Sequence, residues 1–131
     1  MYAPKALKAY QTVGIESGVI GANPHQLVLM LLKGALDRIT TARGAMLRGE
    51  IARKGEAIGQ TLSIVDSLRA SVDQEKGGQL AVNLVSLYTF VEDELLAANL
   101  ASDPDRLQSA GDVLTLIADG WEEIGKGVNN V

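Results

Sequence analysis

Residues 77–88 of the chain read GGQLAVNLVSLY, and the apolar pattern that they open continues to Leu100. A double glycine begins it, and a polar residue, Asn83, sits beside its main stripe. That stripe, spaced by three and four residues, consists of Leu80, Leu84, Leu87, Val91 and Leu95. Side chains at this spacing share one face of an α-helix. The pattern predicts a long amphipathic helix over about residues 78–100.

Three further segments show the same periodicity. The first begins at Asn23, a good N-cap, with Pro24 at the first helical position, and is expected to end near residue 47. The second follows a turn at residues 48–50, and its apolar side is Ile51, Gly55, Ile58, Leu62, Val65, Leu68 and Val72. The last begins after Asp103, and its seam is Leu107, Ala110, Leu114, Ile117, Trp121 and Ile124. Four such helices joined by short turns predict an all-α, antiparallel up-down four-helix bundle.

The segments outside these helices differ in composition. Residues 1–22 are punctuated by Gly14, Gly18 and Gly21 yet carry many apolar side chains, which predicts an N-terminal arm capping the bundle. A short extra helix is expected at residues 3–10. The bundle itself is expected over residues 23–126, and residues 127–131 are expected to be a frayed tail.

Composition excludes several classes of partner. With 131 residues the chain has the length of one domain, and its net charge of −4 argues against nucleic acid and anionic membranes as partners. The longest apolar run, residues 27–32, is far too short for stable membrane insertion. The chain has no cysteine and no secretory signal pattern, so we expect a cytoplasmic protein.

Catalytic and cofactor chemistry lacks the necessary residues. A di-iron site in a bundle needs inward glutamates and paired Glu-x-x-His motifs, whereas this chain has one histidine, His25. We therefore expect no metal, no cofactor and no enzymatic activity. A remote alternative is a histidine phosphotransfer domain, because Lys33 and Gly34 follow His25. However, His25 lies in a first turn, where a surface residue is the simpler interpretation.

Apolar residues exceed what one core face requires. A second set on the helix of residues 78–100 lies off the main stripe, and we predict that it contacts a partner: Val82, Val85, Phe90 and Leu96. Such a surplus must lie under the arm, face a second subunit, or form a groove for a ligand. A homodimeric interaction module without a client is therefore the alternative from a different class.

Several motifs together resemble the FliS family of flagellar export chaperones. They are the double glycine of residues 77–78 with its helix, the run NPHQLVLML at residues 23–31 followed by Gly34-Ala35, and the later Val72-Asp73, Ala98-Asn99, Asp103 and Trp121. The resemblance covers about residues 7–126. Leu32-Lys33-Gly34 departs from it, because the family usually has an aromatic and an acidic residue before that glycine.

The resemblance implies a function and partners. Family members bind the disordered C-terminal region of flagellin, prevent its premature polymerisation, and deliver it to the export gate protein FlhA. The family's N-terminal tyrosine corresponds to Tyr10, which we assign together with Leu7 to a cap over the client surface. We expect a monomer or weak homodimer.

Overall fold

The computed structural model describes residues 23–129, with side chains up to residue 125. The predicted arm at residues 1–22, its short helix at residues 3–10, and the site residues Leu7 and Tyr10 lie outside the described residues.

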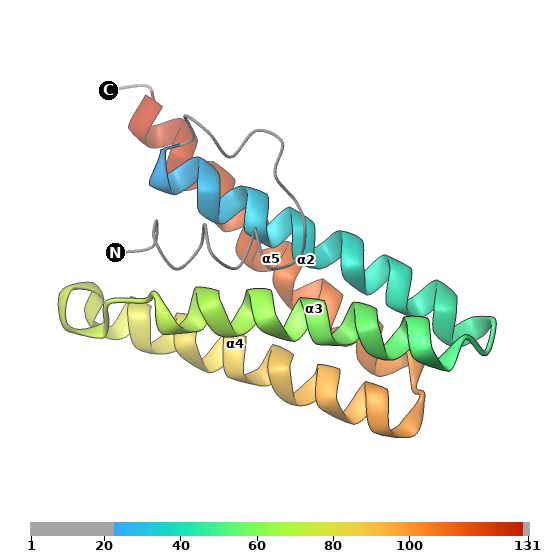
Figure 1. Cartoon of the computed structure of the whole chain (residues 1–131). Helices are drawn as coiled ribbons and strands as arrows, with labels where there is room; N and C mark the ends of the chain where they lie inside the picture. Colours follow the sequence, from blue (N-terminus) through green and yellow to red (C-terminus); the bar gives the residue numbers. More distant parts are fainter. Residues whose placement is uncertain (1–22, 130–131) are drawn as a thin grey trace.

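The described chain folds into four α-helices and no strands: α2 (Pro24–Leu47), α3 (Ile51–Ala70), α4 (Gln74–Ala101) and α5 (Pro104–Asn129). Successive helices run in opposite directions (Figure 1), and contacts join α2 to α3, α3 to α4, α4 to α5 and α5 back to α2. The prediction of an all-α four-helix bundle is confirmed. α5 continues to Asn129, beyond residue 126, where the bundle was expected to end.

Local side-chain caps set the starts of three helices. At α2, Asn23 Oδ1 accepts a hydrogen bond from the Gln26 backbone N at 2.8 Å, and Gln26 Oε1 accepts one from the Asn23 backbone N at 3.2 Å. This capping box satisfies amide groups that have no partner within the helix. Asp73 accepts from the backbone N of Lys76 at α4, and Asp103 caps the start of α5.

The double glycine divides α4 into a first turn and a long main segment. Gly78 has φ 58° and ψ −137°, a backbone conformation that is open essentially to glycine alone. A Cβ atom on Gly77 would lie 2.5 Å from the Cβ of Ala81. Gly78 is therefore required by its backbone conformation, and Gly77 is required because a larger side chain would collide with Ala81.

The core is aliphatic, with Tyr88 as its largest fully buried side chain. The predicted stripe of α4 is fully buried only in its second half, at Val91 and Leu95, whereas Leu84 packs half-buried against the core and Leu80 is 73% exposed. Nearer the start of α4, Ala81 and Tyr88 face the core instead. The ends of the other predicted faces are exposed too, at Ile51 and Ile124.

The exposure of Leu80 follows from the path of α5. Figure 1 shows the end of α5 beside the start of α2, while the start of α4 lies apart from both. Exposure along the seam of α5 increases toward its C-terminal end, where α5 and α4 separate. Leu114 is fully buried, Ile117 is 8% exposed and Ile124 is 52% exposed. The bundle is therefore closed at one end and open at the other.

A buried lysine fastens the closed end. Lys54 of α3 is 6% exposed, and its Nζ donates to the Asn99 backbone O at 3.0 Å and to Ser102 Oγ at 2.8 Å. Ser102 adopts a left-handed conformation as the C-cap of α4. Lys54 thus supplies a positive charge at the C-terminus of α4, with one hydrogen bond to a backbone carbonyl and one to a side-chain hydroxyl.

We predict opposite effects for two Gly→Ala changes. Gly78→Ala should lower the free energy of unfolding by about 1–3 kcal/mol, because alanine is strained at that conformation. Gly59→Ala, at an exposed helical position with no heavy atom within 4 Å, should raise it by about 0.5–1 kcal/mol. Urea midpoints at constant m-value measure both. A higher midpoint for Gly78→Ala would show that the kink is not required.

Candidate functional site

An apolar groove lies at the open end of the bundle, between the first half of α4 and the second half of α5. Its volume is about 220 Å³. We call it the α4–α5 groove, and it is lined by Leu80, Asn83, Leu84, Leu87, Leu116, Ile117, Gly120, Trp121 and Ile124. No charged side chain lines it.

The walls of this groove are exposed leucine and isoleucine side chains. Leu80 is 73% exposed, Leu116 67% and Ile124 52%. Single exposed apolar residues are ordinary on protein surfaces, but a contiguous set around a hollow marks a binding surface. Asn83 is the polar side chain of this lining. Its Oδ1 accepts a hydrogen bond from the Gln79 side-chain amide at 2.9 Å.

Trp121, one wall of the groove, is anchored from behind by the start of α2. Its indole Nε1 donates to the His25 backbone O at 2.9 Å. The His25 ring stacks on the indole, with centroids 5.1 Å apart and planes 8° from parallel, and His25 Nε2 lies 2.6 Å from the Trp121 backbone O. This half-buried, stacked ring differs from the exposed mid-helix histidine that phosphotransfer requires.

The predicted partner-binding residues of α4 fall on two sides of that helix. Val82, Val85 and Leu96 occupy the same helical row as Glu92, which pairs with Arg69 of α3 at 2.7 Å, so this row lies on the α3 side. Val82 and Leu96 are exposed and Val85 is half-buried.

Phe90, 44% exposed, is three residues beyond Leu87 on the α5 side, near the groove but not among its lining residues. The structure therefore does not gather the four predicted residues into one surface, and their role in partner binding stays a prediction.

The Arg69–Glu92 pair has a structural role. Partial burial between α3 and α4 raises the pKa of the Glu92 carboxyl, and the charge of Arg69 opposes that rise. Arg69 also contacts Asp66 of its own helix at 2.7 Å. The Arg69–Glu92 contact joins α3 to α4, and neither residue lines the α4–α5 groove.

None of the residues that line the α4–α5 groove is among the partner-binding residues predicted from the sequence. Leu80, Leu84 and Leu87 were placed on the main stripe of their helix, and Ile124 on the seam of the last one. Leu116 could have indicated the groove from the sequence, because it is an apolar residue that lies off the predicted seam of the last helix, four residues before Gly120.

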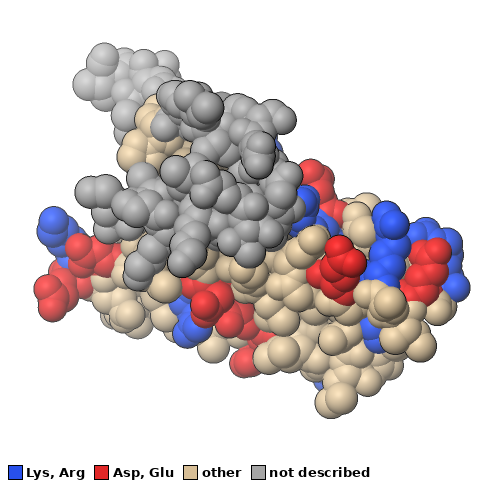
Figure 2. Space-filling view, viewed as in Figure 1, with Lys and Arg blue, Asp and Glu red and all other residues tan. Residues whose placement is uncertain are grey.

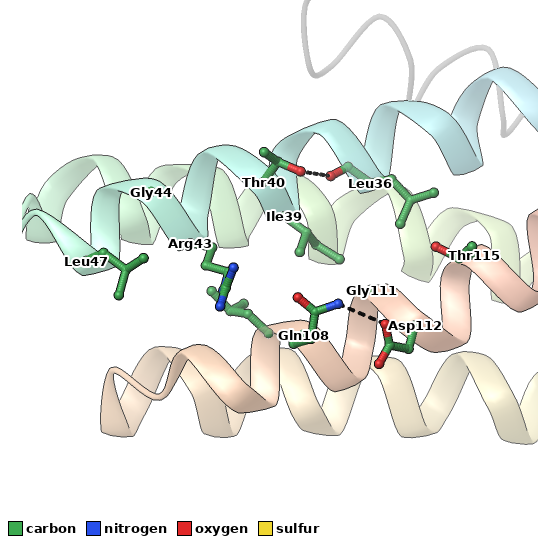
Figure 3. A pocket seen from close by; sticks show the side chains of 11 residues that line it. Leu36, Ile39, Thr40, Arg43, Gly44, Leu47, Gln108, Gly111, Asp112 and Thr115 are labelled. Atoms are coloured by element: carbon green, nitrogen blue, oxygen red, sulfur yellow. Dashed lines mark hydrogen bonds between the residues drawn. The ribbon is translucent and has the colours of Figure 1, made fainter.

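A second hollow of about 500 Å³ lies between α2 and α5 nearer the closed end (Figure 3). Polar and apolar side chains alternate around it, and Figure 3 shows Arg43 of α2 reaching toward α5. The Gln108 amide donates to Asp112 at 2.8 Å. This mixed lining indicates an interhelical surface groove, whereas the α4–α5 groove has no charged side chain and a mainly apolar lining, which is typical of binding sites.

Charge gives the bundle no strong directional field on the face seen in Figure 2. Acidic and basic side chains are interspersed there, with no large patch of one sign. Across residues 23–129, no group of three histidine, aspartate or glutamate side chains is placed to hold a metal ion. None of the four described helices is long and apolar enough to cross a membrane.

Comparison with known proteins gives one consistent result. Residues 6–128 match the family model described as flagellar protein FliS. The chain is 44% identical over 124 residues to the flagellar secretion chaperone FliSB of Pseudomonas aeruginosa, covering 95% of this chain and 98% of the relative. It is 41% identical to the flagellar secretion chaperone FliS of Salmonella typhimurium over 95% of this chain and 93% of that one. It is 36% identical to the flagellar secretion chaperone FliS of Escherichia coli, over 94% of this chain and 91% of that one.

Filling the groove should be possible without disturbing the fold. Gly120 lines the groove, and a Cβ atom there would meet no heavy atom within 4 Å. We predict that Gly120→Leu reduces the fluorescence enhancement of anilinonaphthalene sulfonate, a dye for exposed apolar surface, because the new side chain covers the groove. Gly120→Ala is the control, since it adds helix propensity but little bulk. Equal dye fluorescence in the two variants would contradict the assignment.

Proposed function

The chain belongs to the FliS family of flagellar secretion chaperones, and from this membership we propose that its α4–α5 groove binds the disordered C-terminal segment of flagellin. FliS is a chaperone family, so the expectation that the protein is not an enzyme is confirmed. The resemblance found in the sequence motifs is confirmed as well. A flagellar secretion chaperone implies a flagellar protein as client, and flagellin is the client that we propose.

The observation that carries this proposal is the uncharged lining of an open groove between two helices, in which Asn83 is the one polar side chain and the others are apolar or glycine. An amphipathic helix docks in such a groove by placing residues i, i+3, i+4 and i+7 into it. Leucine side chains of α4 on one side and Leu116 and Ile124 of α5 on the other supply matching walls. The uncharged lining favours apolar anchors of the client over charged ones.

Coupled folding explains how such binding serves secretion. A client segment that is disordered alone pays about 2–5 kcal/mol to become ordered in the groove. While bound, its apolar residues are hidden from other flagellin copies, so premature polymerisation is suppressed. Once released at the export gate, for which we propose FlhA, the segment becomes disordered again. This cycle takes place in the cytoplasm.

The N-terminal arm is proposed to cover the groove in the free protein, with Leu7 and Tyr10 as its apolar contacts. Connectivity supports this proposal, because the arm joins the bundle at Asn23, beside His25, and His25 contacts the groove wall Trp121. A covering arm would hide exposed leucine side chains, and it would lower client affinity in proportion to the covered fraction.

The competing function is homodimerisation through the same apolar surface, without a client. Solution mass separates the two, since a protein whose only role is dimerisation has no reason to be monomeric at micromolar concentration. A monomer that binds the client peptide supports the chaperone function, and a stable dimer that binds no peptide supports the alternative.

We predict that a flagellin C-terminal peptide of about 40 residues from the same bacterium, disordered alone, gains helix on mixing with the protein. Calorimetry should show a negative heat-capacity change, because apolar surface is buried. Gly120→Leu should weaken binding at least about tenfold by occupying the groove, whereas Gly59→Ala on α3 should leave the affinity unchanged. Absence of binding at tens of micromolar would overturn the proposed function.

We also predict that the peptide and the arm compete. Hydrogen exchange of the amides in residues 1–22 should become faster when the peptide is bound, because the arm is displaced. Deleting residues 1–15 should leave the bundle folded, since its helices begin at Pro24. Arm protection that stays the same with and without peptide would show that the arm does not share the groove.

A further inference from the structure

His25 lies outside the groove lining, yet it fixes the side chain that forms one of the groove's walls. It is the second residue of α2, and Trp121 lies in the last third of α5. The two residues are 96 positions apart in the chain. Their contact therefore joins the first turn of α2 to the last third of α5.

The hydrogen bonds between them run in both directions. The Trp121 indole N–H donates to the His25 carbonyl at 2.9 Å. In return, His25 Nε2 must donate to the Trp121 carbonyl at 2.6 Å, because a carbonyl oxygen can only accept. Together with the ring stacking at 5.1 Å, these bonds fix both the position and the plane of the indole. We call this arrangement the His25–Trp121 clasp.

Gly125 makes room for the clasp. It is one helical turn beyond Trp121 on α5, and a Cβ atom there would overlap Cε1 of the His25 ring and lie 2.8 Å from its Nε2. The imidazole thus rests directly on the backbone of α5. Any side chain at position 125 would push the ring away from the indole.

An ion pair between these parts of α2 and α5 is weak by comparison. Lys33 Nζ and Glu122 Oε1 are 3.3 Å apart, and their side chains are 61% and 41% exposed. Exposed ion pairs contribute little to stability. Lys33 is therefore a suitable control for His25, since its removal loosens the same junction without touching the indole.

We propose that His25 is a positioning residue for the α4–α5 groove: it holds the Trp121 indole in the orientation that the groove needs to accept its client. The effect on the client rests on the proposed function, whereas the effect on Trp121 does not. Replacing the His25 side chain removes the ring that stacks on the indole and the bond from its Nε2 to the Trp121 backbone O, and leaves the indole N–H bonded to the residue-25 carbonyl alone. The groove then loses the defined shape of one wall.

The first experiment needs no client. Trp121 is the protein's one tryptophan, so its fluorescence reports on this site alone. In the free full-length protein, His25→Ala and Gly125→Ala should both increase quenching by acrylamide and alter the emission maximum, and Lys33→Ala should change neither. Unchanged quenching in His25→Ala would overturn the proposal.

A double-mutant cycle tests whether the ring itself is the link. Gly125→Ala should perturb Trp121 in the wild-type background, where the imidazole occupies that space. In the His25→Ala background the same change should have no further effect on quenching, because the clashing atoms are gone. Additive effects would show that Gly125 acts on Trp121 independently of His25.

The second experiment measures affinity for the flagellin peptide well below the melting temperature, where all variants are folded by circular dichroism. His25→Ala should raise Kd about tenfold. His25→Gln, which retains an N–H donor, should recover part of the affinity. A purely structural histidine would lower the melting temperature and leave Kd within about twofold, which would overturn the positioning role. If the wild type binds no peptide, the proposed function fails, and the quenching experiment alone decides the clasp.

Discussion

The contact between the first turn of α2 and the last part of α5 ties these two helices together at the end of the bundle where α4 lies apart from them (Figure 1). A helix can pack closely against only some of its neighbours along its whole length, and α5 uses its second half to follow α2. The His25 ring on the backbone at Gly125 and the paired bonds to Trp121 hold that course. The first half of α4 consequently lies apart from the end of α5 (Figure 1), and the α4–α5 groove lies between these two segments.

The two ends of the bundle differ in how much apolar surface they bury. At the closed end, Leu107, Ala110 and Leu114 of α5 are fully buried, and Lys54 satisfies the C-terminus of α4. That end can supply most of the stability, since burying apolar area is the main favourable contribution to folding. At the open end, the described residues leave apolar surface exposed at a cost in free energy, and the client proposed above would recover that cost by covering the groove.

The sequence predicts features that depend on neighbouring residues and fails for features that depend on distant ones. The caps at Asn23 and Asp103 involve residues within three positions, so the starts of α2 and α5 were predictable. Asp73 instead starts α4 at Gln74, four residues before the predicted start near residue 78. Leu80 and Leu95 belong to one stripe, yet one is 73% exposed and the other fully buried. Periodicity states which side of a helix is apolar, not whether another helix lies there.

His25 shows the same limit from the other direction. A histidine in a first turn is typically a surface residue, and nothing within a few positions of it predicts a stacking partner. Its partner lies 96 residues away, and the space for its ring depends on a glycine that by itself suggests only a loose helix end.

The arm joins α2 at Asn23, within the same turn as the residue that holds the groove wall. Two binding events that both depend on this turn must influence one another, and such coupling is equal in both directions. A client that draws Trp121 toward α4 would pull on the root of the arm, and an arm that strains the first turn of α2 would shift Trp121. The proposed competition between client and arm therefore need not rest on overlap alone, because the His25–Trp121 clasp would couple the start of α2 to the groove.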